Sequence, residues 1–153
     1  MQGGLLRRTR AGYDQQGTSE RAFHRPRLGQ SSNGSNNLAE ARNFYDELLG
    51  SAGIQPLLEH PSGGRVYGRD GELAFGVLGP FNKEAATVGN GTMVAFRCWS
   101  RAEVDALHAK AIRLGGSNEG DPGVRGPNWY FSYFRDLDGN KLCAYCTAGV
   151  AGG

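Results

Sequence analysis

Apolar side chains recur every three to four positions in two stretches of the chain, and each stretch predicts an amphipathic helix. In the first stretch the apolar positions are Leu38, Ala41, Phe44, Tyr45, Leu48 and Leu49. Asn36 or Asn37 can cap the start of this helix, because their side chains accept hydrogen bonds from free backbone N–H groups. The second helix begins after Ser100, which forms a capping box with Glu103, and ends near Leu114.

Short apolar runs bounded by turn residues predict strands around both helices. After the first helix these runs cover residues 55–59, 64–68 and 73–78, a pattern typical of a three-stranded meander. Another run precedes the second helix over residues 92–98, and a hairpin follows it over residues 130–135 and 141–146. The stretch 121–127 contains two prolines and two glycines, so we expect a loop there.

This pattern repeats at a constant distance of 63 residues. Ala39-Glu40 and Gly53 correspond to Ala102-Glu103 and Gly116, while Ala41, Phe44 and Leu49 correspond to Val104, Leu107 and Ile112. We therefore predict a duplicated module, each copy holding a helix followed by three strands. The second copy also opens with a strand, whereas only Gly, Ser and Asn precede Leu38. The opening strand of the first copy is therefore expected to be absent or atypical.

Residues 1–37 differ in composition from the rest of the chain. They carry six arginines and two acidic residues and end in a stretch of Ser, Asn, Gly and Gln, which predicts a flexible basic leader. Two alternatives stay open: a basic arm for an anionic partner, or a replacement strand over residues 21–28 despite Pro26. A replaced strand would also allow the chain to complete its barrel by exchanging elements within a dimer.

The predicted domain covers residues 38–148, with modules of about 38–80 and 90–148, and residues 149–153 form a flexible tail. Lys and Arg number 17 against 15 Asp and Glu, and a net charge of +2 lacks the basic excess typical of nucleic-acid binding. We therefore expect no nucleic-acid partner. No run of about 18 apolar residues is present, so we expect no membrane partner either. The odd number of cysteines, three, and the lack of a signal peptide predict a cytoplasmic protein.

Three segments carry a family resemblance: Phe44-Tyr-Asp-Glu-Leu-Leu-Gly50, Gly89-Asn-Gly-Thr-Met-Val-Ala-Phe96 and Tyr133-Phe-Arg-Asp-Leu-Asp-Gly-Asn-Lys-Leu142. Together they resemble the vicinal oxygen chelate superfamily, which includes glyoxalase I, bleomycin-resistance proteins and extradiol dioxygenases. The resemblance covers roughly residues 38–147, and the Arg-Asp-x-Asp-Gly-Asn-Lys-Leu turn is its most specific element. It implies an α+β fold of two βαβββ modules whose curled mixed sheets surround a cleft, often in a homodimer. It implies a divalent metal in that cleft, but no particular reaction.

The metal-binding positions implied by the resemblance are filled differently in this chain. The resemblance implies a His on the opening strand, a His in the Gly-Asn-Gly-Thr strand and a Glu just after the Asp-Gly-Asn-Lys-Leu turn; the last two positions hold Met93 and Cys143 here. A carboxylate on the last strand of the first module is replaced by an apolar run that includes Phe75. We therefore expect no metal cofactor, and we expect Met93 and Cys143 to fill the former metal cavity.

The alternative is a metal-dependent lyase or dioxygenase whose Zn, Ni, Mn or Fe ion is held by an unforeseen set that includes His24 or Cys143. A soft trio of His24, Met93 and Cys143 would suit Cu(I) or zinc. Cys143 and Cys146 have CxxC spacing, but residues three apart in a strand point to opposite faces, so we do not expect them to act together. A nucleophilic Cys143 would need a neighbouring His or helix N-terminus to lower its pKa. We therefore assign no catalytic residue.

Strand alternation gathers aromatic residues on one side of the second module. Trp129, Phe131 and Tyr133 share one face of their strand, as do Met93, Ala95 and Arg97, and Lys141, Cys143 and Tyr145, on theirs. We predict an apolar, aromatic pocket lined by Met93, Cys143, Trp129, Tyr133, Phe75 and Tyr145, with Arg125 and Asn128 at its rim to orient an anionic group. The predicted function is metal-free binding of a small apolar or aromatic ligand by a homodimer. Ordinary core packing is the alternative for Trp129 and Tyr133.

Overall fold

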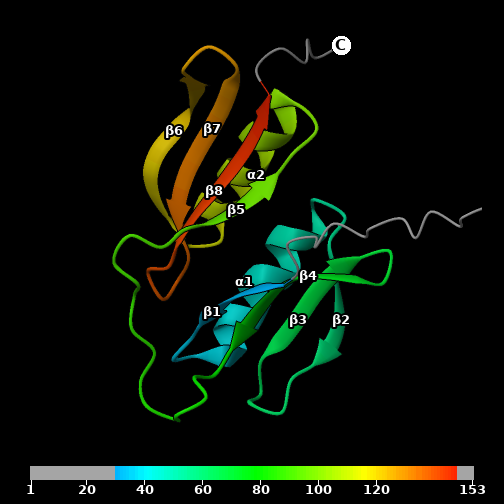
Figure 1. Ribbon diagram of the computed structural model, residues 1–153, viewed down its shortest axis with the longest axis vertical. Coiled ribbons are helices and arrows are strands. Elements are labelled where there is room, and N and C mark those ends of the chain that lie inside the picture. Colours follow the sequence, from blue (N-terminus) through cyan, green and yellow to red (C-terminus); the bar gives the residue numbers. More distant parts are fainter. Residues whose placement is uncertain (1–29, 148–153) are drawn as a thin grey trace, which may run out of the picture.

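The computed structural model describes residues 30–147, which form two consecutive modules (Figure 1). The first module contains β1 (Ser31–Gly34), α1 (Leu38–Gly50), β2 (Gln55–Glu59), β3 (Arg65–Arg69) and β4 (Glu72–Leu78). The second contains β5 (Val94–Arg97), α2 (Arg101–Arg113), β6 (Ser117–Arg125), β7 (Trp129–Arg135) and β8 (Lys141–Thr147). The predicted α+β fold of two βαβββ modules is confirmed. Residues 1–29 of the predicted leader, with His24 and the proposed strand 21–28, lie outside the described residues. So do residues 148–153, which include the predicted tail 149–153.

Each module has one four-stranded mixed sheet, and the two sheets have corresponding strand orders. The orders are β1-β4-β3-β2 in the first sheet and β5-β8-β7-β6 in the second. In each sheet the opening strand runs parallel to the last strand, and the other neighbours are antiparallel. Each helix packs against one face of the sheet of its own module.

The two helices reproduce the 63-residue repeat. Each has 13 residues, and the N-caps Asn37 and Ser100 accept hydrogen bonds from the backbone N–H groups of Glu40 and Glu103. The buried positions correspond in part, because Ala41, Phe44, Val104 and Leu107 are all buried. Leu49 and Ile112 hold equivalent positions at this spacing, but the expectation that both belong to the apolar face was wrong: Leu49 is buried and Ile112 is 37% exposed, while α2 buries Ala111. No helix within residues 30–147 is long and apolar enough to cross a membrane.

The opening strand of the first module is present but atypical, and it lies inside the predicted leader. Its sequence Ser-Ser-Asn-Gly has little intrinsic preference for strands. It forms because β4 offers a free edge, and Ser31 to Gly34 pair in register with Phe75 to Leu78. The N–H of Ser35 continues the ladder to the carbonyl of Leu78 at 3.1 Å. The predicted boundary after residue 37 was therefore wrong, since tertiary pairing overrides the polar composition.

A second difference concerns the stretch predicted as a loop over residues 121–127. Residues up to Arg125 belong to β6, which pairs with β7 along its whole length. The register shifts between Asn118 and Gly120 and again between Gly120 and Gly123. Because β6 is an edge strand with bulges, it accommodates Pro122, which cannot donate to a regular ladder.

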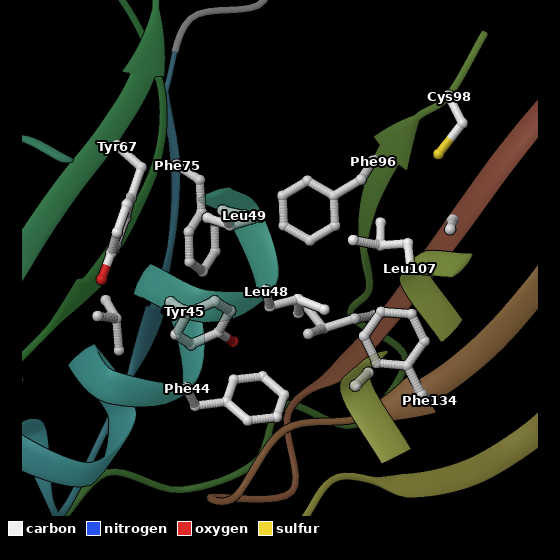
Figure 2. Close-up of a cluster of buried hydrophobic side chains, with 14 of the residues drawn as sticks. Phe44, Tyr45, Leu48, Leu49, Tyr67, Phe75, Phe96, Cys98, Leu107 and Phe134 are labelled. Carbon is white, nitrogen blue, oxygen red and sulfur yellow. The ribbon is translucent and has the colours of Figure 1, made fainter. Parts of the chain in front are cut away.

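A single hydrophobic core joins the two modules on the helix side of both sheets (Figure 2). Phe75 of β4 meets Phe96 of β5 edge-on, with ring centroids 5.6 Å apart. The same cluster includes Leu48 of α1, Leu107 of α2 and Phe134 of β7. Because the helices and this core occupy one side of the sheets, the opposite face of each sheet is left uncovered by the helices.

The turn Asp136-Leu-Asp-Gly-Asn140, which is the most specific element of the family resemblance, has a structural role in this chain. Asp136 is 6% exposed, and its carboxylate accepts hydrogen bonds from the Tyr45 hydroxyl (2.6 Å) and from the backbone and side chain of Asn140 (2.8 and 2.9 Å). The Asn140 amide also donates to the carbonyl of Gly34 at 3.0 Å. Burial, followed by the charge of Asp136, raises the Tyr45 pKa well above its ordinary value of 10.0. The turn therefore fastens α1 and β1 of the first module to the second.

Candidate functional site

The candidate site is the open face of the second sheet, opposite α2. Tyr133 is the register partner of Cys143, and Phe131 is the partner of Tyr145. On the other side of β8, Cys143 pairs with Ala95. The predicted sharing of one face by these strand positions is confirmed. We call the side chains of Trp129, Phe131, Tyr133 and Tyr145 the aromatic face.

The rings of the aromatic face form a continuous stack. Phe131 lies between Tyr133 and Tyr145, with centroid distances of 5.8 and 5.4 Å and interplanar angles of 9° and 16°. Trp129 is tilted by 52° to Phe131 and by 55° to Tyr145, at 6.0 Å from each. Lys141 Nζ lies 5.4 Å from the centre of the Tyr133 ring, a cation–π contact at the other end of the stack.

These rings lie at the surface of the single chain and outside its core. Trp129 is 43% exposed, and the other three members of the aromatic face are half-buried. The alternating positions on the same strands, Phe134 and Leu142, face α2 and are fully buried. Ordinary core packing therefore does not account for Trp129, and Phe131 at the centre of the stack belongs with the candidate residues although the sequence prediction did not include it.

Phe75 does not lie with the aromatic face, so its prediction as a pocket residue was wrong. Its side chain is 1% exposed, and its ring centroid lies 4.8 Å from that of Tyr45 on α1. Strand alternation then places Gly76 on the open face of the first sheet, between its register partners Ser32 and Val66. The first module therefore presents small side chains where the second presents aromatic rings.

The two predicted rim residues lie at the Trp129 end of the aromatic face. Arg125 is the register partner of Trp129 on β6, and its guanidinium donates to the carbonyls of Val124 (3.2 Å) and Asp121 (3.1 Å). Asn128 is exposed in the turn between β6 and β7. Met93 lies at the opposite end, 44% exposed, in a hollow that it lines together with Arg135 and Lys141.

The described side chains do not fit a metal site on this face. Within residues 30–147, no group of three or more His, Cys, Asp or Glu side chains is placed to hold a metal ion. Around Cys143 the open face carries Ala95, Tyr133 and the cationic Lys141. A catalytic metal needs about three protein donors and is disfavoured beside an ammonium group.

Cys143 also lacks the features of a nucleophile. Burial raises the pKa of its thiol from the ordinary 9.0 to about 11, and the nearby Lys141 only partly opposes this shift. The thiol is therefore neutral near pH 7, whereas nucleophilic cysteines have a lowered pKa. Cys146 lies in the core on the other side of β8, so the prediction that the CxxC pair points to opposite faces is confirmed.

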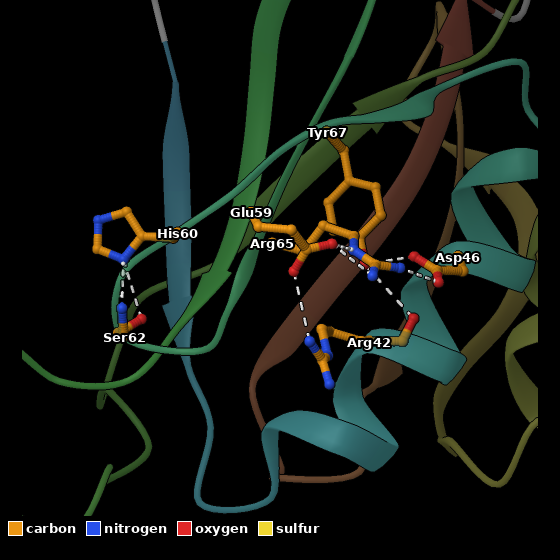
Figure 3. A network of polar contacts seen from close by, with 7 residues as sticks. All are labelled: Arg42, Asp46, Glu59, His60, Ser62, Arg65 and Tyr67. Atoms are coloured by element: carbon orange, nitrogen blue, oxygen red, sulfur yellow. Dashed lines mark hydrogen bonds and ion pairs between the residues drawn. The ribbon is translucent and has the colours of Figure 1, made fainter.

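A second polar cluster lies on the helix side of the first sheet (Figure 3). Arg65 pairs with Asp46 of α1 and with Glu59 of β2, and the Tyr67 hydroxyl donates to Asp46 Oδ1 at 2.8 Å. The hydrogen bond to Asp46 is the largest cause of the raised pKa of Arg65. Arg42 adds an ion pair to Glu59 at 3.3 Å. Because these charges neutralise one another, we interpret the cluster as a brace between α1 and the sheet.

Comparisons with known proteins agree with this architecture. No protein-family model matches the chain, and no curated protein matches it. Among solved structures, a glyoxalase/bleomycin resistance protein from Albidiferax ferrireducens T118 shares 39% identity with a TM-score of 0.71, over 77% of this chain and 96% of that one.

More distant structures are similar in fold. A glyoxalase/bleomycin resistance protein/dioxygenase family enzyme from Burkholderia phytofirmans PsJN has 17% identity and a TM-score of 0.62, over 76% of this chain and 95% of that one. A lactoylglutathione lyase from Agrobacterium tumefaciens has 20% identity and a TM-score of 0.59, over 78% and 92% of the two chains. The repeated modules, the Asp-Gly-Asn turn and the 39% identity over nearly the whole of the first relative show that this chain belongs to the glyoxalase/bleomycin resistance protein family.

Proposed function

We propose that the protein binds a small planar or apolar molecule on the aromatic face without a metal ion. The observation that carries this proposal is the stack of partly exposed rings on the open face of β7 and β8. Exposed aromatic rings bind planar molecules by extending the stack, and each such ring pair contributes about 0.5–1.5 kcal/mol beyond its buried area.

The charges around the aromatic face favour a neutral or anionic ligand. Lys141 and Arg125 lie at its two ends, and Arg97 is the register partner of Tyr145. A cationic ligand would meet these groups at close range, where like charges repel. An aromatic body with a hydroxyl or carboxylate substituent therefore suits the face best.

We further propose that a second copy of the chain covers the aromatic face. The open face of the first sheet carries small and aliphatic side chains at Ser32, Gly76, Val66 and Leu58, and Leu58 is 44% exposed. Such a surface leaves space opposite bulky rings, so a homodimer that opposes the two open faces would form a closed cleft. The buried, free thiols Cys98, Cys143 and Cys146 agree with the reducing, cytoplasmic location that we propose.

The proposal is tested by measuring thermal stability with a panel of planar aromatic compounds, because a ligand that prefers the folded state raises the melting temperature. For any compound that binds, Trp129→Ala and Tyr145→Ala should each weaken affinity about 3- to 10-fold. Phe81→Ala is the matched control, because Phe81 is fully exposed in the linker between the modules. A compound whose affinity is equal in all three variants would place its site elsewhere and contradict the proposal.

A further inference from the structure

A cavity lies on the helix side of the sheets, where the two modules meet. It has a volume of about 260 Å³ and lies between the C-terminal end of α1, one side of α2 and the end of β5. Its apolar lining comes from Leu49, Ile54, Phe96 and Leu107. Phe96 points to the opposite side of β5 from Ala95 and the aromatic face, so the two locations are distinct.

The polar lining of this cavity is predominantly cationic. Four basic residues line it (Arg69, Arg97, Lys110 and Arg113), against the single carboxylate of Glu103. Glu103 already accepts the backbone N–H of Trp99 at 2.8 Å, and Lys110 pairs with Glu47 at 2.7 Å. The lining therefore carries more positive charge than its own acids neutralise.

The three guanidinium groups of the lining have no carboxylate partner within residues 30–147. Arg69 donates to the carbonyls of Ala52 and Gly53 at the end of α1. Arg97 makes a cation–π contact with Trp99, 5.6 Å from its ring centre, and Arg113 forms no ion pair with the described residues. Arginine favours planar oxyanions because its N–H groups match both oxygens of a carboxylate.

We propose that this cavity binds a small amphipathic anion, a carboxylate attached to an aromatic or short aliphatic body. The apolar lining takes the body, and Arg113 takes the carboxylate. A volume of about 260 Å³ limits the ligand to a single small ring or a short chain. Trp99 lines the cavity and is 65% exposed, so a bound ligand would change the environment of its indole. Because α1, α2 and β5 all contribute, the ligand would bridge the two modules.

The test follows the two indole N–H signals of the full chain by NMR, since the protein has only Trp99 and Trp129. The probe is 4-ethylbenzoate, and its neutral counterpart is 4-ethylbenzyl alcohol. The benzoate should shift the Trp99 signal in a saturable manner, with an affinity at least 10-fold higher than that of the alcohol. Equal affinity for the two compounds, or no saturable shift of Trp99, would overturn the proposal.

Two variants locate the binding site. Ala106→Phe fills the cavity from an exposed position of α2 and should abolish the shift, whereas Ala109→Phe, on the same helix but outside the lining, should leave it unchanged. Arg113→Gln should weaken the benzoate at least 5-fold, with Lys83→Gln as the charge control. Unchanged benzoate affinity in both Ala106→Phe and Arg113→Gln would overturn the proposal. Failure here is separate from failure at the aromatic face, because that face is reported by the Trp129 signal.

Discussion

The two modules have the same sequence of elements, but the open faces of their sheets differ. In the first module this face carries Ser32, Gly76 and Val66, while in the second the corresponding side of the sheet carries three stacked aromatic rings and the tilted ring of Trp129. The helix sides are alike, because both bury aromatic and aliphatic residues in one shared core. The repeat therefore determines the scaffold, and the open faces, which the scaffold does not constrain, differ between the modules.

The modules also differ in how their opening strands are held. β5 has the sequence Val-Ala-Phe-Arg, which favours a strand and buries Phe96. β1 has the sequence Ser-Ser-Asn-Gly, and its position depends on pairing with β4 and on the Asn140 bond to Gly34. The first module therefore relies on the second for its opening strand.

The largest expected effect is on stability, and it distinguishes a residue on the helix side of a sheet from one on the open face. Phe75→Ala should lower the free energy of unfolding by about 3–5 kcal/mol, because it leaves a cavity in the shared core. Tyr133→Ala, on the open face, should cost less than about 1.5 kcal/mol, because this half-buried ring leaves no closed cavity. Urea unfolding of both variants measures the difference, and equal losses would contradict our assignment of Phe75 to the core.

A smaller loss is expected when the fastening between the modules is removed. Asp136→Ala leaves the buried Tyr45 hydroxyl and the Asn140 side chain without their acceptor, which should cost about 2–3 kcal/mol. Hydrogen exchange should increase most in β1. Glu84→Ala, an exposed carboxylate in the linker, serves as the control and should change stability by less than about 0.5 kcal/mol. Unchanged protection of the β1 amides in Asp136→Ala would show that the turn does not hold this strand.

The smallest effect depends on pH and concerns the second module, which contains all three cysteines. Burial raises the pKa of Cys98 and of Cys143 from the ordinary 9.0 to about 11. A raised pKa in the folded state means that these thiols stabilise the fold fully below pH 9, and that this stability is lost as the pH rises towards 11.

We therefore expect the urea midpoint to fall between pH 9 and pH 11, and to fall less steeply in Cys143→Ala. Trp99→Phe, which removes no titrating group, is the control and should follow the unmodified protein. An identical pH dependence in Cys143→Ala would show that the Cys143 thiol is not shifted in the folded protein.

The sequence predicts the parts of the fold that depend on local pattern. The helices, their caps and their spacing of 63 follow from apolar periodicity and from Asn37 and Ser100, and alternation in β7 and β8 brings Trp129 and Tyr133 to one face. β1 and the second half of β6 could not be predicted, because both are edge strands held by a neighbouring strand rather than by their own composition.

The site was predicted less completely, for reasons of its own. Placing Phe75 correctly requires knowing which side of β4 faces α1. Simple alternation does not give this side, because the register between β3 and β4 shifts after Tyr67. The basic cavity between α1 and α2 is formed by residues from both modules, so no single motif indicates it.

The central claim is that the aromatic face of the second module binds a ligand without a metal ion. The most direct measurement titrates 2-naphthol, a neutral planar probe, into the protein in the presence of EDTA and follows the Trp129 indole N–H signal by NMR. We expect a saturable shift of this signal with an affinity that does not change when Zn, Ni, Mn or Fe(II) replaces EDTA. Binding that appears only with one of these metals would contradict the account, and would show that a donor set beyond the described residues completes a metal site.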